Sequence, residues 1–194
     1  MPMEPIFEFL ARVETFKNFS ESELGLIVRV TNRRTFKAGE FICREGDVGD
    51  SMYIVKTGVV RISRMAEDGR GVTMARLTEG NVIGEMALID DEVRSASLQA
   101  EEDVIVYEIR RRSFEDMMAA MDPTAYKLLR QMSRLACERI RKVNSQVDFY
   151  INNPRNLFEP EVESGTQKTV ATVKVKGRIN KFLGLFGSGE RKGA

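Results

Sequence analysis

The sequence contains no histidine among its 194 residues. This absence removes serine–histidine and cysteine–histidine nucleophile pairs, histidine general bases and the commonest metal ligand in proteins. Carboxylates do cluster at Glu101, Glu102 and Asp103, but they stand in a polar, turn-like stretch that is typical of a solvated loop. The sequence therefore offers no recognisable catalytic constellation, and we expect a protein that is not an enzyme and that holds neither a metal nor a cofactor.

Cysteines, long apolar runs and net charge are also scarce. The two cysteines, Cys43 and Cys137, are too few for a disulfide framework and suit a reducing cytosol, so we expect a cytoplasmic protein. No apolar run approaches the roughly 20 residues that span a bilayer, and the first residues lack the basic flank and apolar core of a secretion signal. The formal net charge of +1 points by itself to neither nucleic acid nor membrane.

The most informative segment runs from Gly84 to Ser97. Gly84 has no Cβ, so the backbone can approach a ligand closely, and residues 85–88 can open a helical turn whose free amides attract an anion. Ten residues beyond Gly84, Arg94 can fold back and grip two phosphate oxygens with its planar guanidinium. Glu85 supplies an acceptor for a sugar hydroxyl. Each residue alone suits a solvated loop, but together, at this spacing, they predict a site for a nucleotide monophosphate.

This run resembles the phosphate-binding cassette of the cyclic nucleotide-binding domain family. The family pattern has Gly-Glu-hydrophobic-Ala/Gly-Leu, a short loop and then Arg-Ala/Ser/Thr-Ala, and residues 84–88 and 94–96 match it. The resemblance implies that Glu85 holds the ribose 2′-hydroxyl and that Arg94 pairs with the cyclic phosphate. Val93 stands where many members have proline. The cassette residues expected to bind the ligand are Gly84, Glu85, Met86, Ala87, Arg94 and Ser95.

Between residues 35 and 110, short apolar runs alternate with turns that contain glycine, such as those at Gly58 and Gly80. Runs rich in β-formers, as in residues 51–55, recur at regular intervals and predict a sandwich or barrel. The family resemblance, which covers about residues 6–145, implies a jelly-roll-like β-roll. We therefore expect a mainly β fold with flanking helices.

Helices are expected on both sides of the roll. Apolar spacing predicts one helix over residues 6–13, and Ser20 with Glu23 can form a capping box before a second. After the last strand, Ser113 can cap a short helix, and Asp122-Pro123 can begin a long one. The expected parts are an N-terminal helical segment (1–34), the β-roll (35–110), a hinge helix with a long lid or dimerisation helix (111–151), and a linker with a basic tail (152–194).

Five residues of the long helix recur at helical spacing on one face: Leu129, Met132, Ala136, Arg139 and Val143. Four are apolar, which suits packing on the roll or a seam between two copies of the chain, so a homodimer is a candidate assembly. Arg139 is the exception. Its stem can pack while its head reaches solvent or Glu138 of a neighbouring chain. Alternatively, as the resemblance implies for a lid helix, Arg139 can stack on the purine.

The base is the least determined part of the ligand. Met74, in the strand before the cassette, can pack against the base or serve as an ordinary core residue. Ser95 can hydrogen-bond the phosphate or a guanine, which leaves cyclic AMP (cAMP) and cyclic GMP (cGMP) both open. Bacterial-looking members of the family favour cAMP, and cAMP is the expected ligand.

The tail has a different composition from the rest of the chain. Residues 151–194 carry eight Lys or Arg against four Asp or Glu, and residues 177–187 mix apolar with basic side chains. Such a segment can touch an anionic membrane or dock on a protein partner, or it can be a flexible tail, as its glycines favour. No two-helix pattern follows the long helix, so direct DNA binding is not expected.

The leading hypothesis is a non-enzymatic cyclic nucleotide sensor, in which the ligand draws the cassette inward and the long helix closes over the base. One alternative is a ligand-independent scaffold whose basic tail recruits a membrane or a protein. Another is a regulatory subunit of an enzyme carried on a separate chain. The presence of both Glu85 and Arg94 favours the sensor, because a scaffold needs neither.

Overall fold

The structure, a computed structural model, describes residues 5–66 and 68–153. Its helices are α1 (Ile6–Arg12), α2 (Glu21–Arg29), α3 (Arg111–Ala119) and α4 (Pro123–Asn152), with 3-10 turns η1 (Glu14–Phe16) and η2 (Glu85–Leu88). Its strands are β1 (Thr31–Phe36), β2 (Phe41–Cys43), β3 (Ser51–Thr57), β4 (Val60–Met65), β5 (Gly71–Leu77), β6 (Val82–Ile83), β7 (Ser97–Ala100) and β8 (Val104–Arg110). The chain divides into two compact units, residues 1–148 and 149–194, and the strands and the cassette lie in the first.

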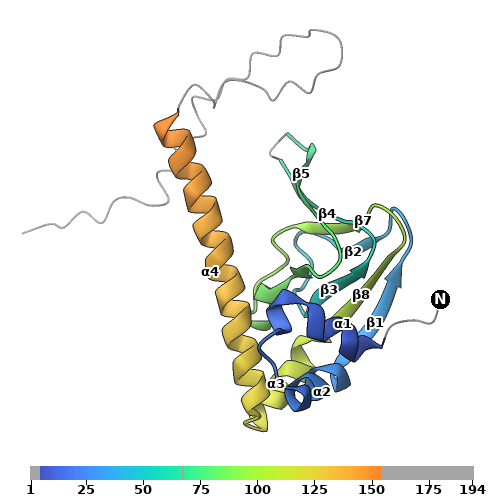
Figure 1. The fold of residues 1–194 in the computed structure, drawn as a ribbon. Helices are drawn as coiled ribbons and strands as arrows, with labels where there is room; N and C mark the ends of the chain where they lie inside the picture. The colour runs from blue at the N-terminus through green and yellow to red at the C-terminus, as the bar shows by residue number, and fades with distance from the viewer. Residues whose placement is uncertain (1–4, 67, 154–194) are drawn as a thin grey trace, which may run out of the picture. The chain divides into compact units, whose positions relative to one another are not determined.

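Two antiparallel four-stranded sheets form a roll (Figure 1), which confirms the predicted fold class. One sheet has the strand order β1-β8-β3-β6 and the other β2-β7-β4-β5. In β3, Tyr53 and Val55 belong to the apolar cluster between the sheets, whereas Met52 and Ile54 belong to a second cluster. This alternation is the period-two pattern of a strand that is covered on both faces.

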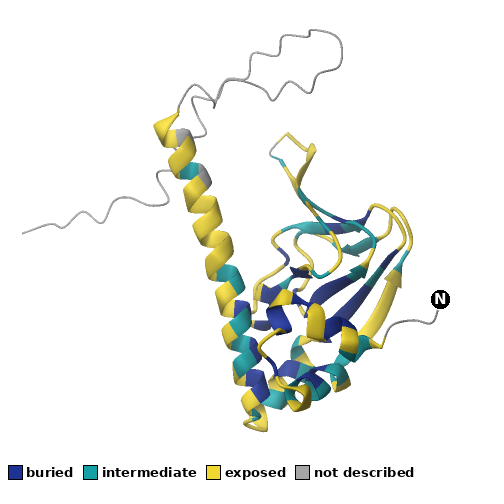
Figure 2. Cartoon of the chain, in the orientation of Figure 1, coloured by how far each residue is buried: buried dark blue, intermediate teal, exposed yellow. Residues whose placement is uncertain are grey.

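The second cluster lies between the first sheet and the helices. Phe9 of α1, Phe16 of η1 and Leu128 and Met132 of α4 pack there with Ile54, and each is at most 2% exposed. Burial of one such side chain contributes about 1.5–3 kcal/mol. The cluster therefore anchors the first half of α4 to the roll, where Figure 2 shows the buried part of this helix.

Two helices begin where their capping residues predict. The Ser20 hydroxyl accepts a hydrogen bond from the Glu23 N–H at 3.3 Å, and the Glu23 carboxylate accepts one from the Ser20 N–H at 2.7 Å. This capping box precedes α2, as expected. Pro123 is the first residue of α4, and the carboxylate of Asp122 accepts from the N–H of Thr124 at 2.8 Å.

Two predicted boundaries were wrong. Ser113 does not cap α3, because β8 runs directly into this helix, which begins at Arg111. The first strand begins at Thr31, before the predicted start at residue 35. The reason is tertiary: β1 pairs with β8 in unbroken register from Thr31 opposite Ile109 to Phe36 opposite Val104, so pairing extends the strand into polar sequence.

Helix α4 extends beyond the core that anchors it. It has 30 residues and is about 45 Å long at 1.5 Å per residue. Met132 is fully buried, whereas Ile140 and Val143 are 60% and 51% exposed, as the change of colour along α4 shows in Figure 2. The helix face predicted from Leu129 to Val143 therefore packs on the roll at Met132 but is exposed to solvent at Val143. Across the described residues, no helix combines the length and apolar character needed to cross a membrane.

Candidate functional site

Gly84 joins β6 to η2 and opens the cassette. Its φ of 71° and ψ of 25° lie in the left-handed region, which glycine adopts without strain. A Cβ built on Gly84 would lie 2.6 Å from Nη1 of Arg94. Glycine is therefore needed here both for the turn and for the room that the guanidinium occupies.

Two backbone hydrogen bonds hold Arg94 beside the cassette turn. Its N–H donates to the Asp47 carbonyl at 2.8 Å, and its carbonyl accepts from the Gly46 N–H at 2.9 Å. The residue is 7% exposed, and its guanidinium lies 5.5 Å from the centre of the Tyr53 ring. These contacts aim the Arg94 side chain toward Gly84.

The buried charge of Arg94 is poorly compensated. Its Nη2 atom is 3.7 Å from a carboxylate oxygen of Asp50, whose side chain is 71% exposed. Within the described part of the chain, the Nε atom of Arg94 is buried and has no hydrogen-bond partner. Because an unsatisfied buried donor of a charged group is costly, the geometry suits an incoming anion.

Glu85, the first residue of η2, is 1% exposed. Both of its carboxylate oxygens accept hydrogen bonds from Nη1 of Arg139 at 2.6 Å. The Nη2 atom of Arg139 donates to the Val82 carbonyl at 2.7 Å. The Arg139 side chain, 49% exposed, thus connects α4 to β6 and to the buried carboxylate.

A pocket of about 120 Å³ lies against the cassette. Cys43, Ile62 and Leu98 add apolar surface from β2, β4 and β7, and Arg139 adds a wall from α4. Burial raises the pKa of the Cys43 thiol, an effect that the charge of Arg94 partly offsets, so the thiol is neutral near pH 7. In the described ranges, no group of three or more cysteine, aspartate or glutamate side chains is placed to hold a metal ion.

The structure brings seven of the eight predicted site residues to this pocket: Gly84, Glu85, Met86, Ala87, Arg94, Ser95 and Arg139. Met74 is the exception. It is 61% exposed, so its interpretation as a core residue was wrong. A register shift explains its position, because Ile62 pairs with Ala75 and Ser63 with Thr73, which leaves Met74 as the extra residue of a bulge.

Arg139 has a partner that the sequence did not suggest. We expected its head on a purine, in solvent or on Glu138 of a neighbouring chain, and in the structure it binds Glu85. The purine contact stays a prediction.

Arg111, at the start of α3, is a further cassette residue that sequence reasoning missed. Its guanidinium donates to the Ala87 carbonyl at 2.6 Å, to the carbonyls of Gly49 and Asp90, and to the Asp91 carboxylate. The Arg111 N–H also donates to the Asp50 carbonyl at 2.7 Å. These bonds tie the cassette to α3. Arg111 stands in a run of three arginines, and nothing in that run distinguishes the middle one.

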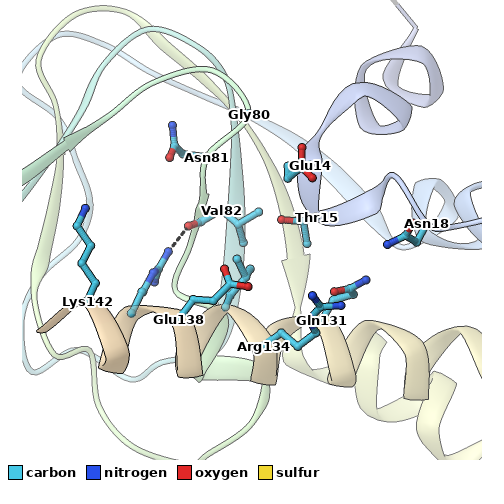
Figure 3. Close-up of a pocket in the computed structure, with 12 residues that line it drawn as sticks. Glu14, Thr15, Asn18, Gly80, Asn81, Val82, Gln131, Arg134, Glu138 and Lys142 are labelled. Carbon is cyan, nitrogen blue, oxygen red and sulfur yellow. Dashed lines mark hydrogen bonds between the residues drawn. The ribbon is translucent and has the colours of Figure 1, made fainter. Parts of the chain in front are cut away.

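A second, larger hollow of about 400 Å³ also has Arg139 in its lining (Figure 3). Figure 3 shows Gln131, Arg134 and Glu138 of α4 facing Glu14 and Thr15 of η1, with Gly80 and Asn81 beside them. The hydrogen bond to Val82 lies at its edge. This hollow has charges of both signs but lacks a buried, uncompensated cation, so the cassette pocket is the stronger candidate site.

Comparison with known proteins agrees with this geometry. The profile of the family described as "cyclic nucleotide-binding domain" matches residues 33–121. A cGMP-dependent protein kinase of Mus musculus is 34% identical over 116 residues, which are 59% of this chain and 15% of the kinase.

Two solved structures are similar in fold as well as in sequence. The catabolite activator protein of Thermus thermophilus has a TM-score of 0.63 and 28% identity, over 70% of this chain and 62% of that one. The regulatory domain of Toxoplasma gondii protein kinase A, crystallised with cAMP, has a TM-score of 0.59 and 26% identity, over 68% of this chain and 48% of that one. All three matches span less than two thirds of the relative's own length. Residues 33–121 of this chain therefore match the cyclic nucleotide-binding domain family in sequence, and the solved structures named above share their fold.

Proposed function

We propose that the chain is a non-enzymatic sensor that binds cAMP in the cassette pocket and reports binding through α4. The observation that carries this proposal is Arg94, a 7% exposed cation whose Nε has no hydrogen-bond partner among the described residues. A cyclic phosphate supplies both the charge and the acceptors that this guanidinium needs. In this arrangement Arg94 pairs with the phosphate, and the cassette residues Gly84, Met86, Ala87 and Ser95 surround it.

Glu85 is the proposed acceptor for the ribose 2′-hydroxyl. A carboxylate has about four lone-pair sites, and Arg139 uses one on each oxygen. Glu85 can therefore accept a hydrogen bond from the ribose hydroxyl, and this bond weakens or displaces the contact with Arg139. Because Glu85 is 1% exposed, a ribose that reaches it must enter the space between η2 and Arg139.

The choice of cAMP rests on the resemblance to bacterial-looking members of the family, because the relatives and the pocket admit both nucleotides. The Toxoplasma regulatory domain was crystallised with cAMP, whereas the mouse relative is a cGMP-dependent kinase, so relatives of both kinds match this chain. Ser95 lines the pocket and can serve either base. The proposed base contacts are Met74, on the bulge of β5, and Arg139, on α4.

Arg139 is the proposed link between occupancy and the position of α4. Its guanidinium touches the ribose acceptor, while its backbone belongs to a helix whose second half is exposed. A ligand shifts this helix only if it binds one helix position better than another. Competition for the Glu85 oxygens provides that difference, because a ribose changes the partners available to Arg139.

Calorimetric titration of the full chain with cAMP and with cGMP tests the proposal. We expect a smaller dissociation constant for cAMP than for cGMP. We expect Arg94→Ala to lose at least ten-fold in affinity, about 1.4 kcal/mol. Arg70→Ala is the matched control, because Arg70 is exposed and pairs with Asp68 in the turn between β4 and β5. Equal affinity of Arg94→Ala and the wild-type chain would refute the phosphate role. Tighter binding of cGMP would correct the base assignment alone.

The exposed second half of α4 supports a homodimer as the assembly. Ala136, Ile140 and Val143 are spaced by four and three residues, as along a two-helix seam, and the last two are 60% and 51% exposed. Analytical ultracentrifugation of the chain and of Val143→Asp tests it. A dimer that Val143→Asp dissociates supports the seam, whereas a monomeric wild-type chain excludes it.

Of the predicted linker and basic tail (152–194), residues 154–194 lie outside the described residues, so the docking of the tail on a membrane or a protein stays a prediction. The cytoplasmic location, the absence of direct DNA binding and the role of regulatory subunit to a separate enzyme also stay predictions.

A further inference from the structure

The loop before β3 and the end of the cassette loop lie side by side. Val48 and Val93 form an isolated antiparallel bridge. The backbone hydrogen bonds that join Arg94 to Asp47 and to Gly46 flank this bridge. These bonds bring residues 46–50 and 86–94 together on one surface beside the pocket.

This surface exposes four large apolar side chains, here called the cassette patch: Val48 (78% exposed), Val93 (55%), Met86 (49%) and Ile89 (44%). Single exposed apolar residues are ordinary, but a group of them on adjoining segments marks an interaction site. Met86 and Val93 also line the pocket, whereas Val48 and Ile89 do not. Neither the core nor the proposed ligand accounts for Val48 and Ile89.

Acidic side chains surround the cassette patch. Asp47 and Glu92 are exposed, and the side chains of Asp50 and Asp91 are 71% and 96% exposed. Arg94 and Arg111 pair with Asp50 and Asp91, so the four carboxylates outnumber these two cations and the surface around the patch is acidic although the whole chain has a net charge of +1. Such a surface repels anionic lipid headgroups and nucleic-acid phosphates and attracts a basic partner.

We propose that the cassette patch binds a protein partner through a segment in which Lys or Arg residues flank apolar anchors. The anchors cover Val48 and Ile89, and the flanking cations face the acidic rim. Because Met86 and Val93 belong to both the patch and the pocket, nucleotide changes the affinity for this partner. That dependence on nucleotide rests on the proposed function, whereas the surface itself does not.

The test selects displayed random peptides on the immobilised full chain and measures the enriched peptides by fluorescence anisotropy. We expect enriched peptides to carry Lys or Arg beside an apolar residue and to bind more weakly as salt rises. Val48→Ser/Ile89→Ser should weaken binding at least ten-fold. Met121→Ser/Tyr126→Ser, which changes side chains 75% and 47% exposed near the start of α4, should leave it unchanged.

Several outcomes overturn the inference. Enrichment of acidic or uncharged peptides would contradict it. So would a control variant that weakens peptide binding as much as the patch variant does. Pelleting of the chain with phosphatidylserine vesicles that is lost in Val48→Ser/Ile89→Ser would assign the patch to membranes instead. A cAMP titration of the patch variant shows whether the pocket is intact. Peptide binding by a chain that binds no nucleotide would contradict the sensor proposal but support the docking surface.

Discussion

Replacing Arg139 with alanine removes the contact that joins α4 to the cassette. The change deletes two hydrogen bonds of 2.6 Å to the Glu85 carboxylate and one of 2.7 Å to the Val82 carbonyl. It leaves behind a carboxylate that is 1% exposed. We expect a loss of folding stability, because a charge that is buried in a low-dielectric site needs a partner.

The magnitude follows from the unequal exposure of the two partners. Removing one partner of a fully buried pair costs about 3–5 kcal/mol, whereas an exposed pair contributes about 0.2–1 kcal/mol. The Glu85 side chain is 1% exposed but that of Arg139 is 49% exposed. Water can therefore reach the carboxylate once the guanidinium is gone, and we expect Arg139→Ala to lower the free energy of unfolding by about 1–2 kcal/mol.

Urea unfolding of the full chain near pH 7 measures this loss, and a double-mutant cycle with Glu85→Gln isolates the pair. We expect a coupling energy of about 1 kcal/mol. Arg134→Ala is the matched control, because Arg134 is an exposed arginine of the same helix, and it should change stability by less than about 0.5 kcal/mol. Additive effects of the Arg139 and Glu85 variants would show that the two side chains do not interact in solution, and the proposed link to α4 would fail.

Three further predictions use other sites. Burial raises the pKa of the Cys43 thiol, so iodoacetamide near pH 7.5 should alkylate the exposed Cys137 before Cys43. Saturating cAMP should slow the alkylation of Cys43 further. Mass spectrometry after timed quenching shows the order of alkylation, and the reverse order contradicts the prediction. Met121 has a φ of 54°, so Met121→Gly should relieve about 1 kcal/mol of strain and raise the melting temperature by about 2–4 °C; a lower melting temperature contradicts this. The Lys37 ammonium and the Ala38 N–H lower the pKa of Asp103. A carboxylate whose pKa is lower in the folded protein contributes stability above its unfolded pKa, and this contribution is lost as pH falls through the folded pKa. Asp103→Asn should therefore lower the free energy of unfolding near pH 7 but not near pH 2, and equal losses at both pH values would contradict this.

The cassette could be predicted from the sequence because its geometry is local. Gly84 dictates the left-handed turn, and the short loop that follows returns Arg94 to the same place. The capping box at Ser20 and the proline start of α4 are equally local, and both were confirmed. Features that depend on a few neighbouring residues can be predicted directly from short sequence patterns.

Met74 and Arg111 could not be placed in the same way. The bulge at Met74 arises from a register shift between β4 and β5, which depends on how both strands meet the rest of the roll. Arg111 binds the cassette because β8 continues into α3 without a loop and carries this residue beneath Asp90. Sequence pattern identifies a strand or a charged run, but the pairing of elements decides which member of the run is enclosed.

Arg139 shows where helical periodicity stops being informative. Met132 is fully buried, and Arg139 follows it by seven residues, so it returns to nearly the same face about 10 Å further along α4. The phase of the helix therefore directs Arg139 toward the roll, as the apolar spacing predicts. What it meets there depends on where the apolar core ends, and at that depth the roll presents the Val82 carbonyl and the Glu85 carboxylate. A long polar side chain is the residue type that can use this edge, because its stem packs while its head reaches the buried acceptors.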